Sequence, residues 1–286
     1  VPALYVVRSS VLAAFAAGRA TACVVDLSAS GATIGPVIDG YQLNRAVVRS
    51  ARGGDFLDEL VVESLGRPIP PRFSVKRQPL STPGETRELL DFPLTHPSYS
   101  RFWVADVARD LRESVCEIPK VSLDLREVKQ RLGEPAPYEL PDGNIVRVEP
   151  QLHILPDVLF RTQRGEDESS DENQNVEEQG SISELVHAAV ARCDLDCRKE
   201  MLGSVVLCGG LSLTRGVPER LGHELTKMVP SAFKVKVTAA TSVERRFSSW
   251  IGGSILASLG SFQQLWLSKE EYDDIGPTLA EKRFNC

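Results

Sequence analysis

Apolar residues recur at helical spacing along the first stretch of the chain. Between residues 2 and 18 they stand three or four positions apart, at Leu4, Val7, Val11 and Phe15, and a glycine follows. This spacing places side chains on one face of a helix, and glycine commonly follows a helix end. The pattern therefore predicts a helix over residues 2–18.

The same repeat predicts further helices. One runs over residues 53–65, with Asp55 as its N-cap, and others run over residues 99–116 and 218–228. The sequence Ser-Ile-Ser-Glu at residues 181–184 has the spacing of a capping box and predicts another helix start.

Short β-rich runs lie between these helices. Residues 21–25 predict a strand, and Asp26 and a small polar turn (LSASGAT, residues 27–33) lead into a second strand. Pro-Asp-Gly within YELPDGNIVRV (residues 138–148) predicts another hairpin, and alternating apolar residues over 233–237 predict a further strand. Strands alternating with helices predict an α/β fold.

The stretch GSVVLCGGLSLTRGVPERLG (residues 203–222) is typical of a buried strand, a glycine turn and a helix. Gly209 and Gly210 follow the strand without a gap, and Pro218 suits a first helical turn. Adjacent glycines let backbone amides approach a ligand, so a binding site is one interpretation. The other is a turn that only needs a positive φ angle.

A valine stripe on the predicted helix 99–116 places Arg109, Arg112 and Glu113 together on the opposite side. Three charges on one helical face are a solvated surface in one interpretation. In the other, their mixed signs hold a purine edge and a ribose. The spacing does not decide between the two.

Composition narrows the possible functions. The net charge of −6 and pI near 5.4 argue against general nucleic-acid binding, and no apolar run is long enough to span a membrane. The six cysteines are scattered, as in a reducing compartment, and we expect no zinc site. Residues 164–180 hold seven acids and predict a disordered acidic loop, and Val1 at the start suggests a fragment.

Several longer motifs resemble one family. WIGGSILASL (250–259), SFQQLWLSKEEYD (261–273), YELPDG (138–143) and CDLDCRKEML (193–202) closely resemble the actin family. The resemblance implies the α/β actin-like ATPase fold, in which two similar halves flank a nucleotide cleft. The chain looks like its carboxyl-terminal three quarters.

That fold implies a division of the chain. We expect residues 1–16 and 248–286 to be the remnant of the first half, 17–52 and 183–247 the core of the second half, 53–160 its outer subdomain, and 161–182 an acidic, disordered insertion.

RSARGGDF (residues 49–56), the acidic insertion and the hairpin at Asp26 resemble a nuclear branch of actin-related proteins. Its members are subunits of chromatin-remodelling and histone-acetyltransferase complexes. The resemblance implies a nuclear scaffold that binds actin and a basic helix of a remodelling ATPase, with histones as further candidate partners. It implies no membrane and no sequence-specific nucleic-acid binding.

The resemblance also implies ATP with Mg²⁺ as a structural ligand and assigns the nucleotide-binding residues. They are Asp26, which approaches the metal through water, and Ser28, Ala29, Ser30, Gly54, Arg109, Arg112, Glu113, Gly209, Gly210, Leu213, Thr214 and Arg246. Thr214 replaces an aromatic residue of the family pattern and Arg246 a lysine, so the nucleotide affinity stays open.

Three departures from conventional actin imply a protein that is not an enzyme. Ser9 and Thr33 stand where a glutamine and a histidine orient the attacking water, and Ala29 replaces an aspartate near the metal. Hydrolysis needs an oriented water, so we expect very slow turnover. Seven acids in residues 164–180 also disfavour a filament contact.

We expect the partner helix to lie in an apolar groove formed by Trp250, Phe262, Leu265 and Trp266, about half of which face the interior. The alternative is an ATP-hydrolysing, filament-forming cytoskeletal protein like conventional actin. A sugar or acetate kinase on the same superfold would need a catalytic acid that the sequence does not suggest.

Overall fold

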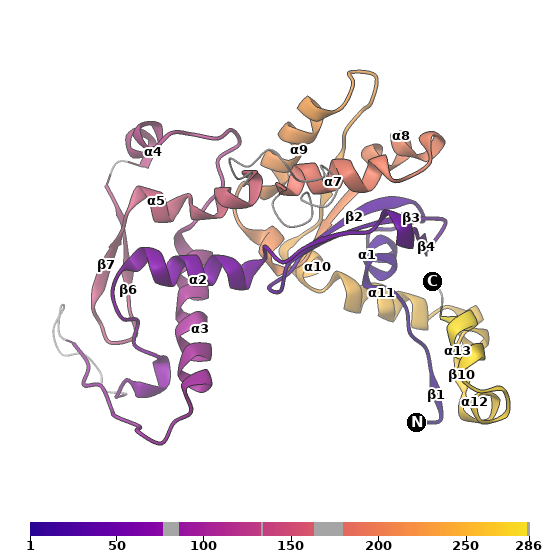
Figure 1. Ribbon diagram of the computed structural model, residues 1–286, viewed down its shortest axis with the longest axis horizontal. Helices are drawn as coiled ribbons and strands as arrows, with labels where there is room; N and C mark the ends of the chain where they lie inside the picture. The colour runs from indigo at the N-terminus through magenta and orange to yellow at the C-terminus, as the bar shows by residue number, and fades with distance from the viewer. Residues whose placement is uncertain (77–85, 133, 163–179, 285–286) are drawn as a thin grey trace, which may run out of the picture.

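The centre of the molecule is a mixed six-stranded sheet (Figure 1). The computed structural model describes residues 1–76, 86–132, 134–162 and 180–284. The strand order is β4-β3-β2-β8-β9, and β5 pairs with β3. The strands are β2 (Ala22–Leu27), β3 (Ala32–Ile38), β4 (Tyr41–Gln42), β5 (Val48–Ser50), β8 (Val205–Cys208) and β9 (Val237–Ala239). The two hairpin pairs and β5 are antiparallel, whereas β2–β8 and β8–β9 are parallel.

Both faces of the two central strands, β2 and β8, are covered. Their sequences, ACVVDL and VVLC, are almost wholly apolar, as expected for strands buried on both sides. In the parallel ladder Asp26 lies opposite Cys208, so the carboxyl ends of these strands meet. The predicted turn after Asp26 and the predicted turn at Gly209 therefore share one edge of the sheet.

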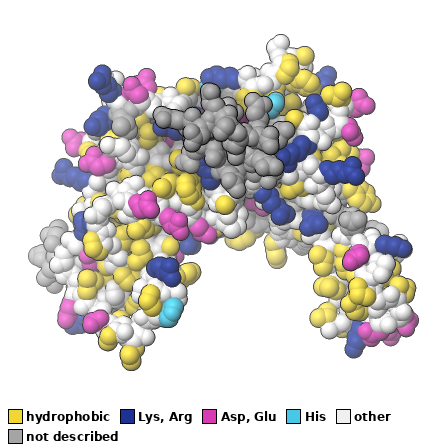
Figure 2. Space-filling model, viewed as in Figure 1, with side chains coloured by type: hydrophobic (Ala, Val, Ile, Leu, Met, Phe, Trp, Pro, Cys, Tyr) yellow, Lys and Arg dark blue, Asp and Glu magenta, His cyan; other side chains and the backbone are white. Residues whose placement is uncertain are grey.

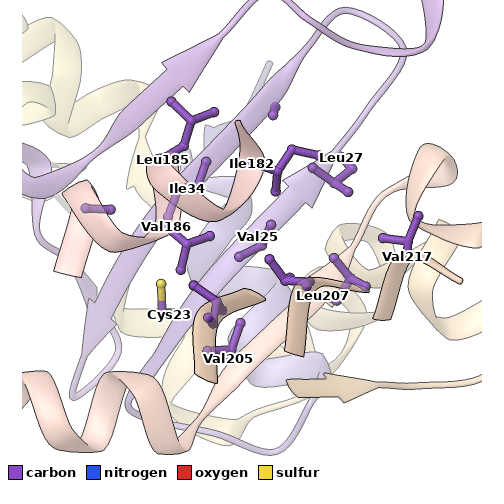
Figure 3. Close-up of a cluster of buried hydrophobic side chains, with 14 of the residues drawn as sticks. Cys23, Val25, Leu27, Ile34, Ile182, Leu185, Val186, Val205, Leu207 and Val217 are labelled. Atoms are coloured by element: carbon purple, nitrogen blue, oxygen red, sulfur yellow. The ribbon is translucent and has the colours of Figure 1, made fainter. Parts of the chain in front are cut away.

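Three helices cover one face of the sheet: α7 (Ile182–Ala191), α8 (Leu195–Gly203) and α9 (Val217–Met228). The cluster that they form with the sheet includes Leu185 and Val186 of α7 and Val25 and Leu207 of the strands (Figure 3). The other face packs on α1 (Ser9–Ala16), which lies against α11 (Ser248–Ala257). Alternate residues of β2 belong to these two clusters, as the pleat of a strand requires.

A second lobe extends from the sheet beside α2 (Gly54–Leu65), at the left of Figure 1. It contains α3 (Pro97–Val115), α4 (Leu125–Leu132), the hairpin β6 (Ala136–Glu139) and β7 (Ile145–Val148), α5 (Pro150–His153) and the 3₁₀ segments η2 (Arg72–Ser74) and η3 (Leu155–Phe160). Its core joins α2, α3 and the hairpin through Val61, Leu111 and Leu140.

The two ends of the chain lie side by side. β1 (Ala3–Leu4) pairs with β10 (Leu267–Ser268), and α12 (Lys269–Ile275) and α13 (Pro277–Arg283) follow β10. α10 (Ser242–Arg246), η5 (Gly260–Gln264) and the short η1 (Asn44–Ala46) complete the connections.

Several predictions about local structure are confirmed. The capping box at Ser181 is present, with Glu184 as its partner, and so are the hairpins at Ser28–Gly31 and Pro141–Gly143. The predicted disordered loop at residues 164–180 lies outside the described residues except for its last glycine. The described residues include no helix long and apolar enough to cross a bilayer.

Two predictions about element bounds are wrong. The helix predicted over residues 2–18 begins only at Ser9, because Ala3 and Leu4 form a strand that pairs with β10. The strand predicted over residues 233–237 begins only at Val237. Pairing with a distant strand decides both, and helical or alternating periodicity does not report such pairing.

Candidate functional site

The turn between β2 and β3 forms the first part of the candidate site. Its ends are closed by Ser28, whose backbone N–H and Oγ both donate to the carbonyl of Gly31 at 2.9 Å. Ala29 and Ser30 lie at the exposed tip. A Cβ on Gly31 would lie 2.2 Å from the carbonyl oxygen of Ser50, so only glycine fits beside β5.

The turn is bonded to the start of α2. The backbone N–H of Gly54 donates to the carbonyl of Ser28 at 3.0 Å, and that of Asp55 donates to the carbonyl of Ala29 at 2.8 Å. These two bonds give partners to the first backbone N–H groups of α2, which an N-cap side chain would otherwise accept from. The prediction that Asp55 is the N-cap is therefore wrong, because Gly53 occupies that position.

The two glycines after β8 differ from each other. Gly209 has φ +88°, and a Cβ there would lie 2.2 Å from the carbonyl oxygen of Leu27 and 2.5 Å from Oδ1 of Asp26. A Cβ on Gly210, which is exposed, would meet no atom within 4 Å. Gly209 is thus required for packing against β2, whereas Gly210 leaves open space beside its backbone.

Asp26 lies between these two turns. It pairs with Thr33 in the antiparallel ladder and with Cys208 in the parallel one, and its carboxylate is partly buried. Burial raises the pKa of Asp26, and burial together with the Asp26 charge raises the pKa of the Cys208 thiol to about 12. Among the described residues, no three His, Cys, Asp or Glu side chains are grouped to hold a metal ion directly.

Of the two interpretations of Arg109, Arg112 and Glu113, the solvated surface does not describe Arg112. Its side chain is only 4% exposed, and its Nε donates to Oδ1 of buried Asp58 at 2.7 Å. Arg109 is partly exposed, with its Nε 3.7 Å from Oδ2 of Asp58. Glu113 is 55% exposed. The buried face of α3 is wider than the apolar stripe that the periodicity predicts, because it includes Ala108 and Arg112.

Sequence reasoning missed Asp58. It follows Gly54 by four positions, which places both residues on one side of α2, and its neighbours Leu57 and Val61 are fully buried. An acidic residue within an apolar helical stripe is the sequence signal that could have identified it, because buried carboxylates need partners.

The remaining predicted contacts lie along the segment after β8. Leu213 ends η4 (Gly210–Leu213), and Thr214 follows it. Ser212 Oγ donates to the carbonyl of Gly209 at 2.6 Å, which fixes the turn. Arg246 is exposed, with its guanidinium 5.9 Å from the ring centroid of Phe247. Within the described chain, no hydrogen bond or ion pair joins Arg246 to Arg109, Arg112 or Asp58.

Of the three positions where the resemblance implies a departure from conventional actin, two lie at or beside the first turn. Thr33 lies in β3 directly opposite Asp26, and Ala29 is at the tip of the turn. Ser9 is the first residue of α1 and is exposed. None of the three carries an imidazole, an amide or a carboxylate.

The four residues predicted to form one apolar groove are divided. Phe262 and Trp266 line a cavity of about 370 Å³ together with β1, α1 and α11, and their ring centroids are 5.5 Å apart. Trp250 and Leu265 are not among the lining residues, and Trp250 is 74% exposed. Figure 2 shows apolar side chains on the surface of this terminal region, at the lower right. Phe262 and Trp266 therefore share a pocket that Trp250 and Leu265 do not line, and the partner groove stays a prediction.

Comparison with known proteins identifies the family. A sequence model described as Actin matches residues 1–285. The chain belongs to the actin family. It is 41% identical over 293 residues to actin-related protein 4 of Oryza sativa subsp. indica. The identity to the Arabidopsis thaliana protein of that name is 38%, and to the Neurospora crassa one it is 35%.

These alignments cover 99% of this chain but only 63–65% of each relative. The chain thus spans slightly less than two thirds of the length of these actin-related proteins. The resemblance and the actin-like α/β fold predicted from the sequence motifs are confirmed. The subdomain bounds and the nucleotide-binding roles stay predictions.

Proposed function

We propose that this actin-family chain belongs to a nuclear actin-related protein that serves as a non-catalytic scaffold subunit of chromatin-remodelling and histone-acetyltransferase complexes. The observation that carries the proposal is the 35–41% identity to actin-related protein 4 along 99% of the chain. The residues around Asp26 lack side chains that could orient an attacking water, which supports a protein that does not hydrolyse ATP.

We propose ATP with Mg²⁺ as a structural ligand of this site. The space beside Gly210 and the exposed tip at Ala29 and Ser30 fit a phosphate chain, since backbone amides approach most closely where no side chain intervenes. A single carboxylate, Asp26, suits a Mg²⁺ ion that keeps most of its water ligands. The metal would supply charge neutralisation for the phosphates.

The residues around Asp26 are suited to holding a nucleotide more than to cleaving it. Hydrolysis of a γ-phosphate requires a water fixed by hydrogen-bonding groups in line with the leaving oxygen. Thr33 offers only a short hydroxyl, and Ala29 offers a methyl group where an acceptor would hold metal-bound water. Ser9 is exposed at the start of α1 and has an equally short side chain.

A steady-state phosphate-release assay on the full-length protein tests the absence of catalysis. Conventional actin under polymerising conditions is the control, measured in parallel with the same ATP concentration. We expect release close to the protein-free background. Release at a rate like that of polymerising actin would overturn the scaffold proposal and favour an ATP-hydrolysing, filament-forming protein.

The partners that we propose are actin and a basic helix of a remodelling ATPase. The pocket beside Phe262 and Trp266 supports this, because an amphipathic helix is bound by inserting apolar side chains into such a cavity. Trp266 is 36% exposed and therefore accessible from the surface.

A pull-down with a peptide of that basic helix tests the docking proposal. Trp266→Asp in the full-length protein should abolish retention of the peptide, whereas Trp250→Asp should leave it unchanged, since Trp250 lies outside the pocket lining. Circular dichroism must show that both variants are folded. Retention by a folded Trp266→Asp variant would contradict docking at this pocket.

A further inference from the structure

A buried carboxylate, that of Asp58, lies in α2, the helix whose first residues are bonded to the β2–β3 turn. The Asp58 side chain is only 2% exposed, and it accepts a hydrogen bond of 2.7 Å from Nε of Arg112, which is 4% exposed. Arg109 lies 3.7 Å from the other carboxylate oxygen, which has no hydrogen-bond partner. Burial raises the pKa of Asp58, and the two arginines oppose that shift. Desolvating such a group is costly, so its placement needs an explanation.

The hydrogen bond from Nε determines where the rest of the guanidinium lies. A Cβ built on Gly54 would be 3.5 Å from Nη2 of Arg112 and 3.2 Å from Cα of Ala29. Nη2 therefore reaches the junction between the β2–β3 turn and the first residue of α2. In the described part of the chain the two Nη groups donate no hydrogen bond, and Oε1 of Glu113 lies 4.0 Å from Nη2.

We propose that Asp58 is a positioning residue that directs Arg112 toward the sugar and base of a bound nucleotide. The inference rests on the proposed nucleotide binding and adds a residue to it. Asp58 occupies Nε and leaves the Nη donors for acceptors of the ligand, such as ribose hydroxyls or ring nitrogens. Without the Asp58 charge, Arg112 is free to turn toward exposed Glu113.

The test compares ATP with inorganic tripolyphosphate, which has the phosphates but neither sugar nor base. Binding to the full-length protein is measured by isothermal titration calorimetry. Asp58→Asn, which keeps the shape and removes the charge, should weaken ATP binding about tenfold, as when a supporting partner of a binding group is removed. Tripolyphosphate affinity should not change, because the groups proposed to hold the phosphates are the turns after β2 and β8 and do not include Arg112.

Asp110→Asn is the matched control. Asp110 lies on α3 like Arg112, but it is exposed and contacts Arg72 and Tyr138 instead. This variant should bind both ligands as the unchanged protein does. If Asp58 acts through Arg112, Arg112→Gln should also weaken ATP binding alone, and adding Asp58→Asn should cause no further loss.

Two results would overturn the inference. One is normal ATP affinity in a folded Asp58→Asn variant. The other is an equal loss of affinity for ATP and tripolyphosphate, which indicates a general structural role. If the Asp58→Asn variant does not fold, the Arg112→Gln variant is measured instead, and normal ATP affinity in that variant would also overturn the inference. An unchanged protein that binds no ATP refutes the proposed nucleotide binding itself, and this inference with it.

Discussion

Replacing Gly209 with alanine should destabilise the fold strongly. Its backbone conformation, φ +88° and ψ 156°, is sparsely populated by residues with a Cβ and costs about 1–3 kcal/mol. The new methyl carbon would also lie 2.2 Å from a carbonyl oxygen of β2, and overpacking of this kind costs about 1–3 kcal/mol more. The expected loss in the free energy of unfolding is therefore about 2–6 kcal/mol.

Equilibrium unfolding in guanidinium chloride measures this loss, and Gly210→Ala is the adjacent control. Its methyl group would meet no atom within 4 Å, so its unfolding free energy should change by less than about 0.5 kcal/mol. If ATP approaches this backbone, the same control variant should bind ATP more weakly. A Gly209→Ala variant as stable as the unchanged protein would refute the packing argument. Equal losses of unfolding free energy in both variants would refute the claim that Gly209, and not Gly210, is required for packing.

Three further substitutions test the surrounding structure. Leu185→Ala in the core cluster should lower the unfolding free energy by about 2–5 kcal/mol in denaturant titration, and Ser181→Ala, which removes a capping box, by about 1 kcal/mol. The hydrogen bonds from Arg283 hold the pKa of Glu271 at about 2, against 4.5 for a free side chain, so the stability from Glu271 is present above pH 4.5 and lost as the pH falls toward 2. In the Glu271→Gln variant the melting temperature should therefore depend less on pH between those values. A pH dependence equal to that of the unchanged protein would contradict this linkage.

Local sequence patterns predicted the part of the fold that is stabilised by short-range contacts. The turn after Asp26 and the capping box at Ser181 use residues within four positions of each other, and both are as predicted. The strand β1 and the late start of α1 at Ser9 depend on pairing with β10, more than 260 residues along the chain. Periodicity within one segment contains no information about such a partner.

The candidate site shows the same division. The sequence predicted that Asp26 and Gly209 belong to turns at strand ends, and parallel pairing brings the two strand ends together. It did not predict that Arg112 is buried, because that position depends on Asp58 in another helix. Trp250 and Trp266 are both aromatic residues of the terminal segment, and the sequence does not distinguish them. The packing of β1 and α11 forms a pocket that Trp266 lines and Trp250 does not.

Native mass spectrometry of the purified full-length protein tests the central claim most directly, because it reports the bound nucleotide and the subunit state in one spectrum. We predict a monomer, or a one-to-one complex with actin or the remodeller subunit, that carries one ATP with Mg²⁺ and keeps that mass after prolonged incubation. A series of self-associated species carrying ADP would contradict a scaffold that holds ATP without cleaving it.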